Sequence, residues 1–299
     1  MATFVDRAWI EAQLCDRRPV AVALTPNGLA DAVVAGEFCL PHQESMPFER
    51  LANLLQQEAS SPDAPVYYYQ AQNNNLRDEF KALFHQVPPH IPFVTDSLGS
   101  HPDAINFWCG SARAVTSFHK DHYENVYAVL SGSKTFHLIP PTEAWALEER
   151  TFPASQYTLG ENGSWTREPV YIDATSGETS TTPGPSHSRM TTRWCSLDPT
   201  ADSSQAQCFR ERVGLTTRDP LCVTVTLYRG DVLYLPALWA HKVTQGPGRH
   251  GDGSATWCSG AVAVNYWYDM NFASPVFLLH RILRDLAAEA GYMEADVEA

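Results

Sequence analysis

The sequence predicts a mainly β fold, a sandwich or barrel with flanking α-helices. Short runs rich in β-branched and aromatic residues follow one another between residues 103 and 269, and Gly, Pro and Ser turns separate them. Helical patterns precede and follow these runs. The 299 residues can form one domain with a substantial core, and 44% hydrophobic and 18% charged residues are typical of a globular chain.

Helical and extended patterns alternate in the N-terminal part of the chain. In chain order we expect a short helix over 9–14, a strand over 19–28 that ends in a Pro-Asn-Gly turn, a helix over 48–59, a strand over 66–72 and a helix over 76–87. The second of these helices is predicted by apolar residues at helical spacing, namely Phe48, Leu51, Leu54 and Leu55.

The later strands and the last helix have clearer boundaries. The β-rich runs lie at 103–110, 125–141, 222–243 and 259–269, and the SGSK sequence at 131–134 predicts a hairpin turn. The C-terminal helix is expected over 274–291, with Ser274 as N-cap and Pro275 in the first turn. Its apolar stripe predicts either packing on the barrel or pairing in a homodimer.

Residues 159–219 interrupt the β pattern with a low-complexity stretch rich in Gly, Ser, Thr and Pro. Its centre, 175–192, has too few apolar residues to bury, so we expect a mobile insertion there. Because β-rich runs continue on both sides, we place this insertion inside a single domain that spans 1–299. No internal repeat is visible.

Composition restricts the partners and the compartment. The seven cysteines are widely spaced without a CxxC pair, which is typical of reduced thiols in a cytosolic protein, with access to the nucleus as an alternative. No long uncharged apolar run and no apolar leader are found, so we expect no membrane partner. The net charge of −13 disfavours nucleic acid and favours a Lys/Arg-rich protein partner, although it is equally compatible with simple solubility.

Three residues suggest a metal centre. His119 and Asp121 are two positions apart, and alternate residues of a strand share a face, so their side chains are expected to project together. His241, at the end of a short loop after a strand, is the third candidate ligand. Two histidines and one carboxylate form the facial triad of non-haem iron(II) oxygenases. The alternatives are a hydrogen-bonded core histidine, an aspartate in a turn or cap, and a surface histidine.

Together with the blocks around these ligands, the chain resembles the JmjC oxygenases. The similar blocks are VAVALTPNGLADAV, DAINFWCGSARAVTSFHKDHYENVYAVLSGSKTFHLIPP, GDVLYLPALWAHKV and AVNYWYDM, in the same order as in the family. Within the family they look most like the lysyl (3S)-hydroxylase type. The resemblance implies a double-stranded β-helix of the jelly-roll or cupin-like kind, with Fe(II) as the metal, 2-oxoglutarate as cosubstrate and O2 as oxidant.

The resemblance also implies which residues bind 2-oxoglutarate. For its distal carboxylate, Lys134 matches the family's lysine, Thr116 its threonine and Tyr68 its tyrosine, with Tyr127 as a second tyrosine candidate. At the keto end, Asn125 and Asn265 match amides of relatives. A solvated hairpin lysine is the alternative for Lys134, whereas Asn265 lies in an apolar strand and must be hydrogen-bonded there.

The chain departs from the family pattern in three places. Lys242 follows the third candidate ligand where many relatives have a second histidine, and the insertion is longer. The chain also begins near the family's first barrel strands, without the helical segment that precedes them.

We expect Trp108 and Trp267 to form the barrel wall rather than to contact substrate.

The function implied by the resemblance is hydroxylation of C3 of a lysine in a protein substrate such as a translation-related GTPase. Glu124 and Asp269 are candidates for contact with the lysine ammonium, with surface solvation as the alternative. Three other functions remain open: a histone lysine demethylase, a peptidase, and an inactive JmjC scaffold that only binds partners.

Overall fold

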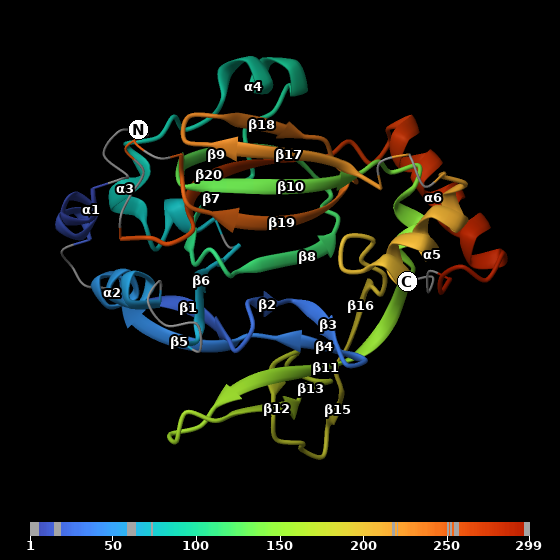
Figure 1. Cartoon of the computed structure of the whole chain (residues 1–299), viewed down its shortest axis with the longest axis horizontal. Coiled ribbons are helices and arrows are strands. Elements are labelled where there is room, and N and C mark those ends of the chain that lie inside the picture. Colours follow the sequence, from blue (N-terminus) through green and yellow to red (C-terminus); the bar gives the residue numbers. More distant parts are fainter. Residues whose placement is uncertain are drawn as a thin grey trace.

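The computed structural model describes residues 6–14, 19–58, 64–72, 74–216, 219, 221–249, 251, 253 and 257–295. Two sheets form the body of the molecule (Figure 1). The larger sheet has the order β18 (Val232–Leu235), β9 (Tyr123–Ser131), β20 (Ala261–Asp269), β7 (Ala104–Gly110), β6 (Val66–Tyr69), β1 (Pro19–Thr25) and β5 (His42–Pro47). The smaller sheet has the order β17 (Val223–Tyr228), β10 (Ser133–Ile139), β19 (Ala240–Gly246), β8 (Val115–His119) and β2 (Leu29–Ala30).

The core strands change sheet along the chain. Strands β7, β9, β18 and β20 belong to the larger sheet, and β8, β10, β17 and β19 belong to the smaller one. This alternation is the double-stranded β-helix, or jelly roll, that the sequence and the family resemblance predict. The predicted fold class is therefore confirmed.

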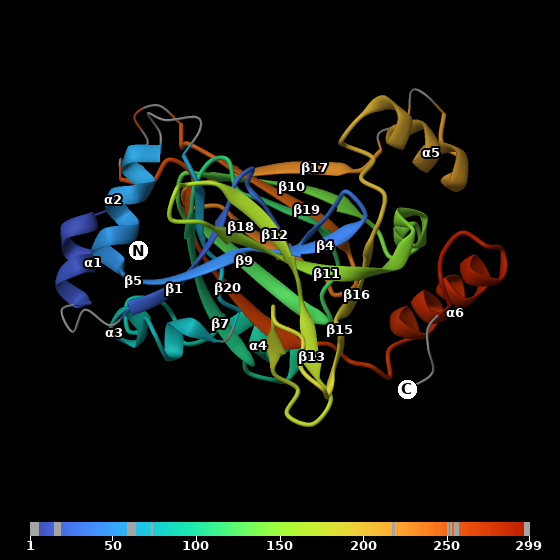
Figure 2. The same ribbon diagram turned by 90° about the horizontal axis from the view of Figure 1, so that it is seen from below.

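The central strands are buried on both faces, which explains their nearly continuous apolar sequences. In β20, Val264 and Tyr266 pack in the core beneath the N-terminal helices, whereas Ala263 and Asn265 face the space between the sheets. The N-terminal helices are α1 (Arg7–Gln13), α2 (Phe48–Glu58) and α3 (Lys81–Phe84). They lie at one end of the sheets, opposite α5 (Ser203–Val213) and α6 (Pro275–Glu289) (Figure 2).

The predicted hairpin at 131–134 is wrong. Strands β9 and β10 do not pair with each other in this structure, because the chain crosses from one sheet to the other at Gly132. Gly132 has a φ of +73°, and a Cβ there would lie 2.0 Å from the carbonyl oxygen of Gly260. A glycine is required at this corner by both the backbone conformation and the close approach. The crossing places Lys134 inside the smaller sheet rather than at an exposed tip.

The stretch 175–192, expected to be a mobile insertion, contains short paired strands. Strands β14 (Thr179–Ser180) and β15 (His187–Arg189) pair with β13 (Tyr171–Asp173). Strand β16 (Thr191–Cys195) pairs with β11 (Glu149–Leu159), which continues the sheet of β12 (Trp165–Pro169), β4 (Glu37–Leu40) and β3 (Ala32–Val34). At the end of this stretch Met190 packs against Phe38, Ala154 and Val170, and in β16 Trp194 also packs on Phe38, with ring centroids 4.9 Å apart.

The helices follow the predicted pattern with two differences. The helix expected over 76–87 is broken into η2 (Asn75–Arg77) and α3, and the buried Asn75 side chain instead bonds the backbone of Phe107. Helices α4 (Pro92–Leu98) and α5 and the turn η3 (Ala144–Leu147) were not predicted, and α5 lies inside the stretch interpreted as an insertion. In the described part of the chain, no helix combines the length and the hydropathy that crossing a membrane requires.

Helix α6 begins where the sequence predicts, because the Ser274 side chain accepts a hydrogen bond from the Phe277 amide at 3.2 Å. Its orientation is unexpected. The buried side chains are His280, Arg284 and Ala287, whereas much of the apolar stripe is exposed. The exposed members are Val276, Leu278, Leu279, Ile282 and Leu286. The helix contacts the barrel through the ion pair of Arg284 with Glu149 and through Phe277, which packs against Ala237, Leu238 and Met270.

Candidate metal centre and cosubstrate cavity

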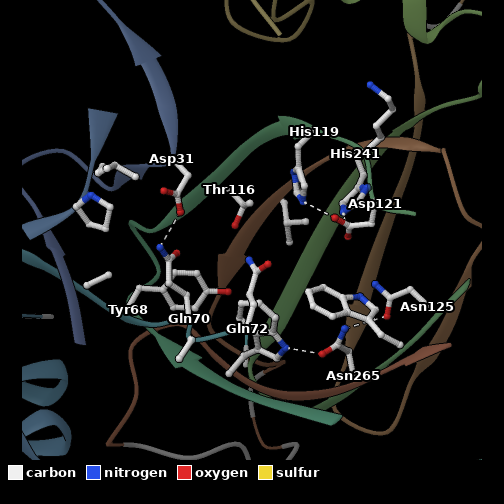
Figure 3. A pocket seen from close by; sticks show the side chains of 18 of the residues that line it. Asp31, Tyr68, Gln70, Gln72, Thr116, His119, Asp121, Asn125, His241 and Asn265 are labelled. Atoms are coloured by element: carbon white, nitrogen blue, oxygen red, sulfur yellow. Dashed lines mark hydrogen bonds and ion pairs between the residues drawn. The ribbon is translucent and has the colours of Figure 1, made fainter. Parts of the chain in front are cut away.

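A cavity of about 600 Å³ lies between the two sheets (Figure 3). All nine candidate site residues line it, although they come from six separate segments of the chain. These residues are Tyr68, Thr116, His119, Asp121, Asn125, Tyr127, Lys134, His241 and Asn265. The volume is in the range typical of pockets for small molecules.

A β-bulge aims the first candidate ligand into the cavity. His119 is opposite His241 in the pairing of β8 with β19, but Thr116 is opposite Val243. Three steps along β8 thus match two steps along β19, which places one extra residue in β8. Thr116 and His119 would face opposite sides of a regular strand, and the bulge lets both line the cavity.

The other two ligands lie close to strand ends. Strand β8 ends at His119, so Asp121 belongs to the following turn and not to the strand that the sequence suggested. The backbone amide of Leu238 donates to the Asp121 carbonyl at 2.9 Å and so links this turn to the loop before β19. His241 is the second residue of β19 and is almost completely buried.

The three ligand atoms converge with free lone pairs. His119 Nε2 lies 3.9 Å from one oxygen of Asp121, His241 Nε2 lies 3.7 Å from the other, and the three groups lie within 4.8 Å of one another. In both histidines Nδ1 lies within hydrogen-bond distance of a backbone carbonyl, at 2.9 Å from Ser117 and 3.0 Å from Trp239. Nδ1 must therefore donate, which leaves the Nε2 lone pairs directed at the site.

Burial keeps His241 neutral, the form that binds a metal. Burial and the neighbouring His119 lower the pKa of His241 to about 4, and Asp121 opposes this change only in part. Two neutral imidazoles and one carboxylate are a donor set that suits a divalent iron ion and leaves coordination positions for other groups. The residues present thus fit the metal that the family resemblance implies.

A single buried ammonium lies at the other end of the cavity. Lys134 is 1% exposed, and its Nζ donates to the Tyr68 hydroxyl at 3.0 Å. The rings of Tyr68 and Tyr127 lie 5.2 and 5.4 Å from Nζ. Burial lowers the pKa of Lys134 to about 7 and raises the pKa of Tyr68. A buried cation with neutral neighbours is a site for an anionic group.

The two candidate amides form a chain of hydrogen bonds along the cavity wall. The Trp108 indole N–H donates to Asn265 Oδ1 at 2.8 Å, and Asn265 Nδ2 donates to Asn125 Oδ1 at 3.1 Å. This chain satisfies the buried Asn265 amide and fixes the orientation of both amides. Trp108 and Trp267 are buried as expected, and both also line the cavity. The same two side chains thus form part of the barrel wall and part of the cavity surface.

The family can be assigned from this geometry together with comparisons to known proteins. The model of the cupin-like domain family matches residues 10–274. The chain is 35% identical over 260 residues to the human bifunctional peptidase and (3S)-lysyl hydroxylase JMJD7, which covers 85% of this chain and 68% of the relative. This chain belongs to the JmjC group of the cupin-like family.

Other members of the JmjC family show how activities vary on this scaffold. The lysine-specific demethylase JMJ32 of Arabidopsis thaliana is 35% identical over 274 residues, 89% of this chain and 71% of the relative. JmjC domain-containing protein E of Dictyostelium discoideum is 29% identical over 272 residues, 85% of this chain and 70% of the relative. These relatives have two different named activities. The comparisons therefore establish that the chain belongs to the JmjC oxygenase family, and they do not establish which reaction it catalyses.

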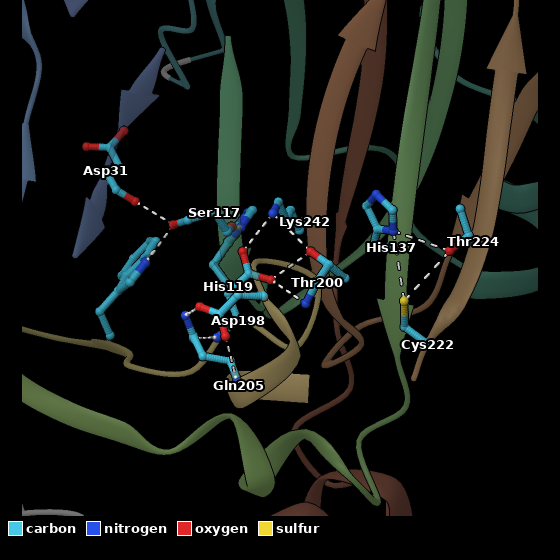
Figure 4. Close-up of polar contacts among 12 residues, drawn as sticks. Asp31, Ser117, His119, His137, Asp198, Thr200, Gln205, Cys222, Thr224 and Lys242 are labelled. Carbon is cyan, nitrogen blue, oxygen red and sulfur yellow. Dashed lines mark hydrogen bonds and ion pairs between the residues drawn. The ribbon is translucent and has the colours of Figure 1, made fainter. Parts of the chain in front are cut away.

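The residue that follows the third ligand in this JmjC chain has a structural partner. Lys242 Nζ lies 2.6 Å from an Asp198 oxygen and donates to the Thr200 hydroxyl at 3.0 Å (Figure 4). Lys242 is absent from the lining of the cavity, so it ties β19 to the segment before α5 instead. Its presence in place of a second histidine does not disturb the cluster of three candidate ligands.

The two acids proposed for contact with the substrate ammonium do not line this cavity. Glu124 accepts hydrogen bonds from the Tyr234 hydroxyl at 2.6 Å and from the Ala237 amide at 3.2 Å. Asp269 is exposed at the end of β20. Among the lining residues that sequence reasoning missed are Asp31, Gln70 and Trp194. An aspartate inside the apolar run LADAVV is the signal that marks Asp31.

Proposed function

We propose that this chain is an Fe(II)- and 2-oxoglutarate-dependent protein hydroxylase that acts on a lysine side chain. The observation that carries the proposal is one cavity with two opposite ends, the two-histidine, one-carboxylate cluster and the buried Lys134 ammonium. The similarity to a (3S)-lysyl hydroxylase supports lysine as the target and C3 as the carbon. The net charge of −13 suits a basic protein segment.

Each of the nine candidate residues has a role in the proposed reaction. His119, Asp121 and His241 would hold Fe(II), which supplies the activation of O2 when it is bound. Lys134, Tyr68 and Thr116 would bind the distal carboxylate of 2-oxoglutarate, with Tyr127 beside them, and the Asn265–Asn125 pair would orient its keto end. Overall, 2-oxoglutarate, O2 and a C–H group give succinate, CO2 and a C–OH group, so that one oxygen atom of O2 enters succinate and the other enters the hydroxyl group.

The apolar strands around the site exclude water from this chemistry. Phe136, Val243 and Trp108 line the cavity between the charged ends. A low-dielectric wall strengthens the attraction between Lys134 and a bound carboxylate. The protein thus supplies binding, orientation and exclusion of water, while the metal and cosubstrate supply the oxidation.

Lysine demethylation is the second candidate, favoured by the 35% identity to a lysine-specific demethylase. Hydroxylation of an N-methyl carbon releases formaldehyde, so the two reactions can be separated by product. The test is mass spectrometry of lysine and methyl-lysine peptides after incubation with the protein, Fe(II), 2-oxoglutarate and O2. Gain of one oxygen on unmethylated lysine supports the hydroxylase, whereas formaldehyde from methyl-lysine without that gain supports the demethylase.

Matched variants connect the activity to the cavity. His119→Ala removes a proposed ligand and should abolish both succinate formation and the peptide product. Exposed His85→Ala removes an imidazole far from the ligand set in sequence and should leave both unchanged. Hydroxylation that persists in His119→Ala contradicts the ligand assignment, and wild-type protein that forms no iron-dependent succinate identifies an inactive scaffold.

A further inference from the structure

Asp31 places a carboxylate in the cavity from outside the ligand set. It lies between β2 and β3, with a φ of +52°, a conformation that aspartate tolerates better than most residues. Its backbone amide donates to the Cys39 carbonyl at 3.0 Å, and its own carbonyl accepts from Ser117 Oγ at 2.8 Å (Figure 4). These backbone contacts fix the residue and leave the side chain directed at the cavity (Figure 3).

The carboxylate of Asp31 has a neutral partner where a cation would be expected. Gln70 Nε2 donates to it at 3.0 Å, and within the described residues no lysine or arginine forms an ion pair with it. Burial raises the pKa of Asp31, and His119 opposes this change only in part. A largely buried carboxylate without a cation is costly unless a ligand supplies the positive charge.

Neither of the two lysines that line the cavity forms an ion pair with Asp31, because each has another partner. Lys120 is paired with Glu149, and Lys134 lies at the other end against Tyr68. The cavity therefore offers one uncompensated cation, Lys134, and one carboxylate that takes no part in the ligand cluster, Asp31. A carboxylate of a diacid cosubstrate supplies the negative charge for Lys134, and an ammonium group supplies the positive charge for Asp31.

An aromatic wall beside Asp31 suits an aliphatic chain. The Trp194 ring lies nearly parallel to the His119 ring, at 6° and a centroid distance of 5.9 Å. The Trp194 indole N–H donates at 2.8 Å to Ser117 Oγ, the same hydroxyl that donates to the Asp31 carbonyl. One serine thus links the aromatic wall to the backbone of the acidic residue, and Phe38 packs behind the wall.

We propose that Asp31 binds the side-chain ammonium of the target lysine while Trp194 packs along its methylene groups. The inference rests on the proposed function and names the residue that selects lysine. A primary ammonium can donate to both Asp31 and the Gln70 amide oxygen, whereas a trimethylated one has no N–H to donate. With the nitrogen held at Asp31, carbon atoms of the side chain face the ligand cluster, which favours C-hydroxylation over demethylation.

The test compares binding of blocked lysine (N-acetyl-lysinamide) with blocked norleucine, which lacks the ammonium, by ligand-observed NMR. Asp31→Asn removes the charge but keeps a Gln70 partner and tolerance of positive φ, so it should fold. In the wild type we expect lysine to bind at least about 10-fold more tightly than norleucine, and in Asp31→Asn this ratio should fall toward one. Exposed Asp285→Asn, which removes the same charge outside the cavity, should keep the wild-type ratio.

The outcomes separate this inference from the proposed function. A lysine preference that Asp31→Asn retains, or a wild type without any preference, overturns the role of Asp31. Loss of 2-oxoglutarate-dependent succinate formation without peptide in Asp31→Asn also overturns it, because the residue would then act on the cosubstrate. A preference that depends on Asp31 in a protein that hydroxylates no lysine peptide sustains the binding site and rejects the proposed reaction.

Discussion

Replacing Lys134 with methionine should stabilise the protein without cosubstrate and remove binding of 2-oxoglutarate. Lys134 is buried, and its burial lowers the pKa from 10.5 to about 7. The unfolded chain then holds a proton more tightly than the folded chain does. The contribution of this group to stability is therefore complete above about pH 10.5 and is lost as the pH falls toward 7.

The size of the effect follows from these values. Between about pH 10.5 and 7 the loss is about 4 kcal/mol, since each pH unit corresponds to about 1.4 kcal/mol. Methionine has a similar shape and removes this cost, but it gives up the hydrogen bond to Tyr68, worth about 1 kcal/mol. The net gain at pH 7 is about 3 kcal/mol, or a rise in Tm of about 6 °C for a chain of this size.

Thermal and urea denaturation with and without 2-oxoglutarate measure both parts of the prediction. Wild-type protein should gain stability from the cosubstrate, and Lys134→Met should not. At about pH 10 the advantage of the variant should shrink, because little of the wild-type cost remains there. The control is Lys81→Met, which removes an exposed lysine of α3. A Lys134→Met protein that is less stable than wild type at pH 7 without cosubstrate refutes the reasoning.

Two further predictions concern α6 and its attachment. Burial alone would raise the pKa of Glu149, but Lys120 and Arg284 lower it to about 2. Its ion pairs therefore contribute about 3 kcal/mol to stability above about pH 4.5, and this contribution is lost as the pH falls toward 2. Glu149→Gln should therefore be less stable than wild type at pH 7, and urea midpoints should converge at low pH; parallel curves would contradict this. We also expect a homodimer through the exposed stripe of α6, so Ile282→Asp should halve the mass measured by light scattering while exposed Asp285→Asn leaves it unchanged. A wild-type monomer would reject the dimer.

The sequence predicts the fold and the location of the site better than the local geometry. Alternating apolar strands, the HxD pair and a distant histidine suffice to place His119, Asp121 and His241 around one cavity. The β-bulge in β8 could not be predicted, because register depends on pairing with β19, a strand more than a hundred residues away. The assumption that both HxD residues share one strand was wrong, although their side chains do converge.

Composition and periodicity failed where tertiary partners decide the outcome. In the polar stretch around 175–192, β14 and β15 pair with β13 in a small sheet of their own, whereas β16 pairs with β11 and brings Trp194 to the cavity. Helix α6 has the expected apolar stripe but turns His280 and Arg284 inward, and Arg284 donates a hydrogen bond to Glu149. Helical periodicity reveals that a stripe exists and leaves open which surface will meet it.

The bulge in β8 makes the ligand set depend on a count of residues as well as on their identity. With the present spacing of three residues, a regular β8 would turn either Thr116 or His119 away from the cavity, and the bulge prevents this. Deleting one residue between them would leave a spacing of two, with which a regular strand turns both side chains toward the same face. In aligned sequences of this scaffold, the number of residues between the threonine and the first histidine therefore indicates whether the strand needs a bulge to complete the site.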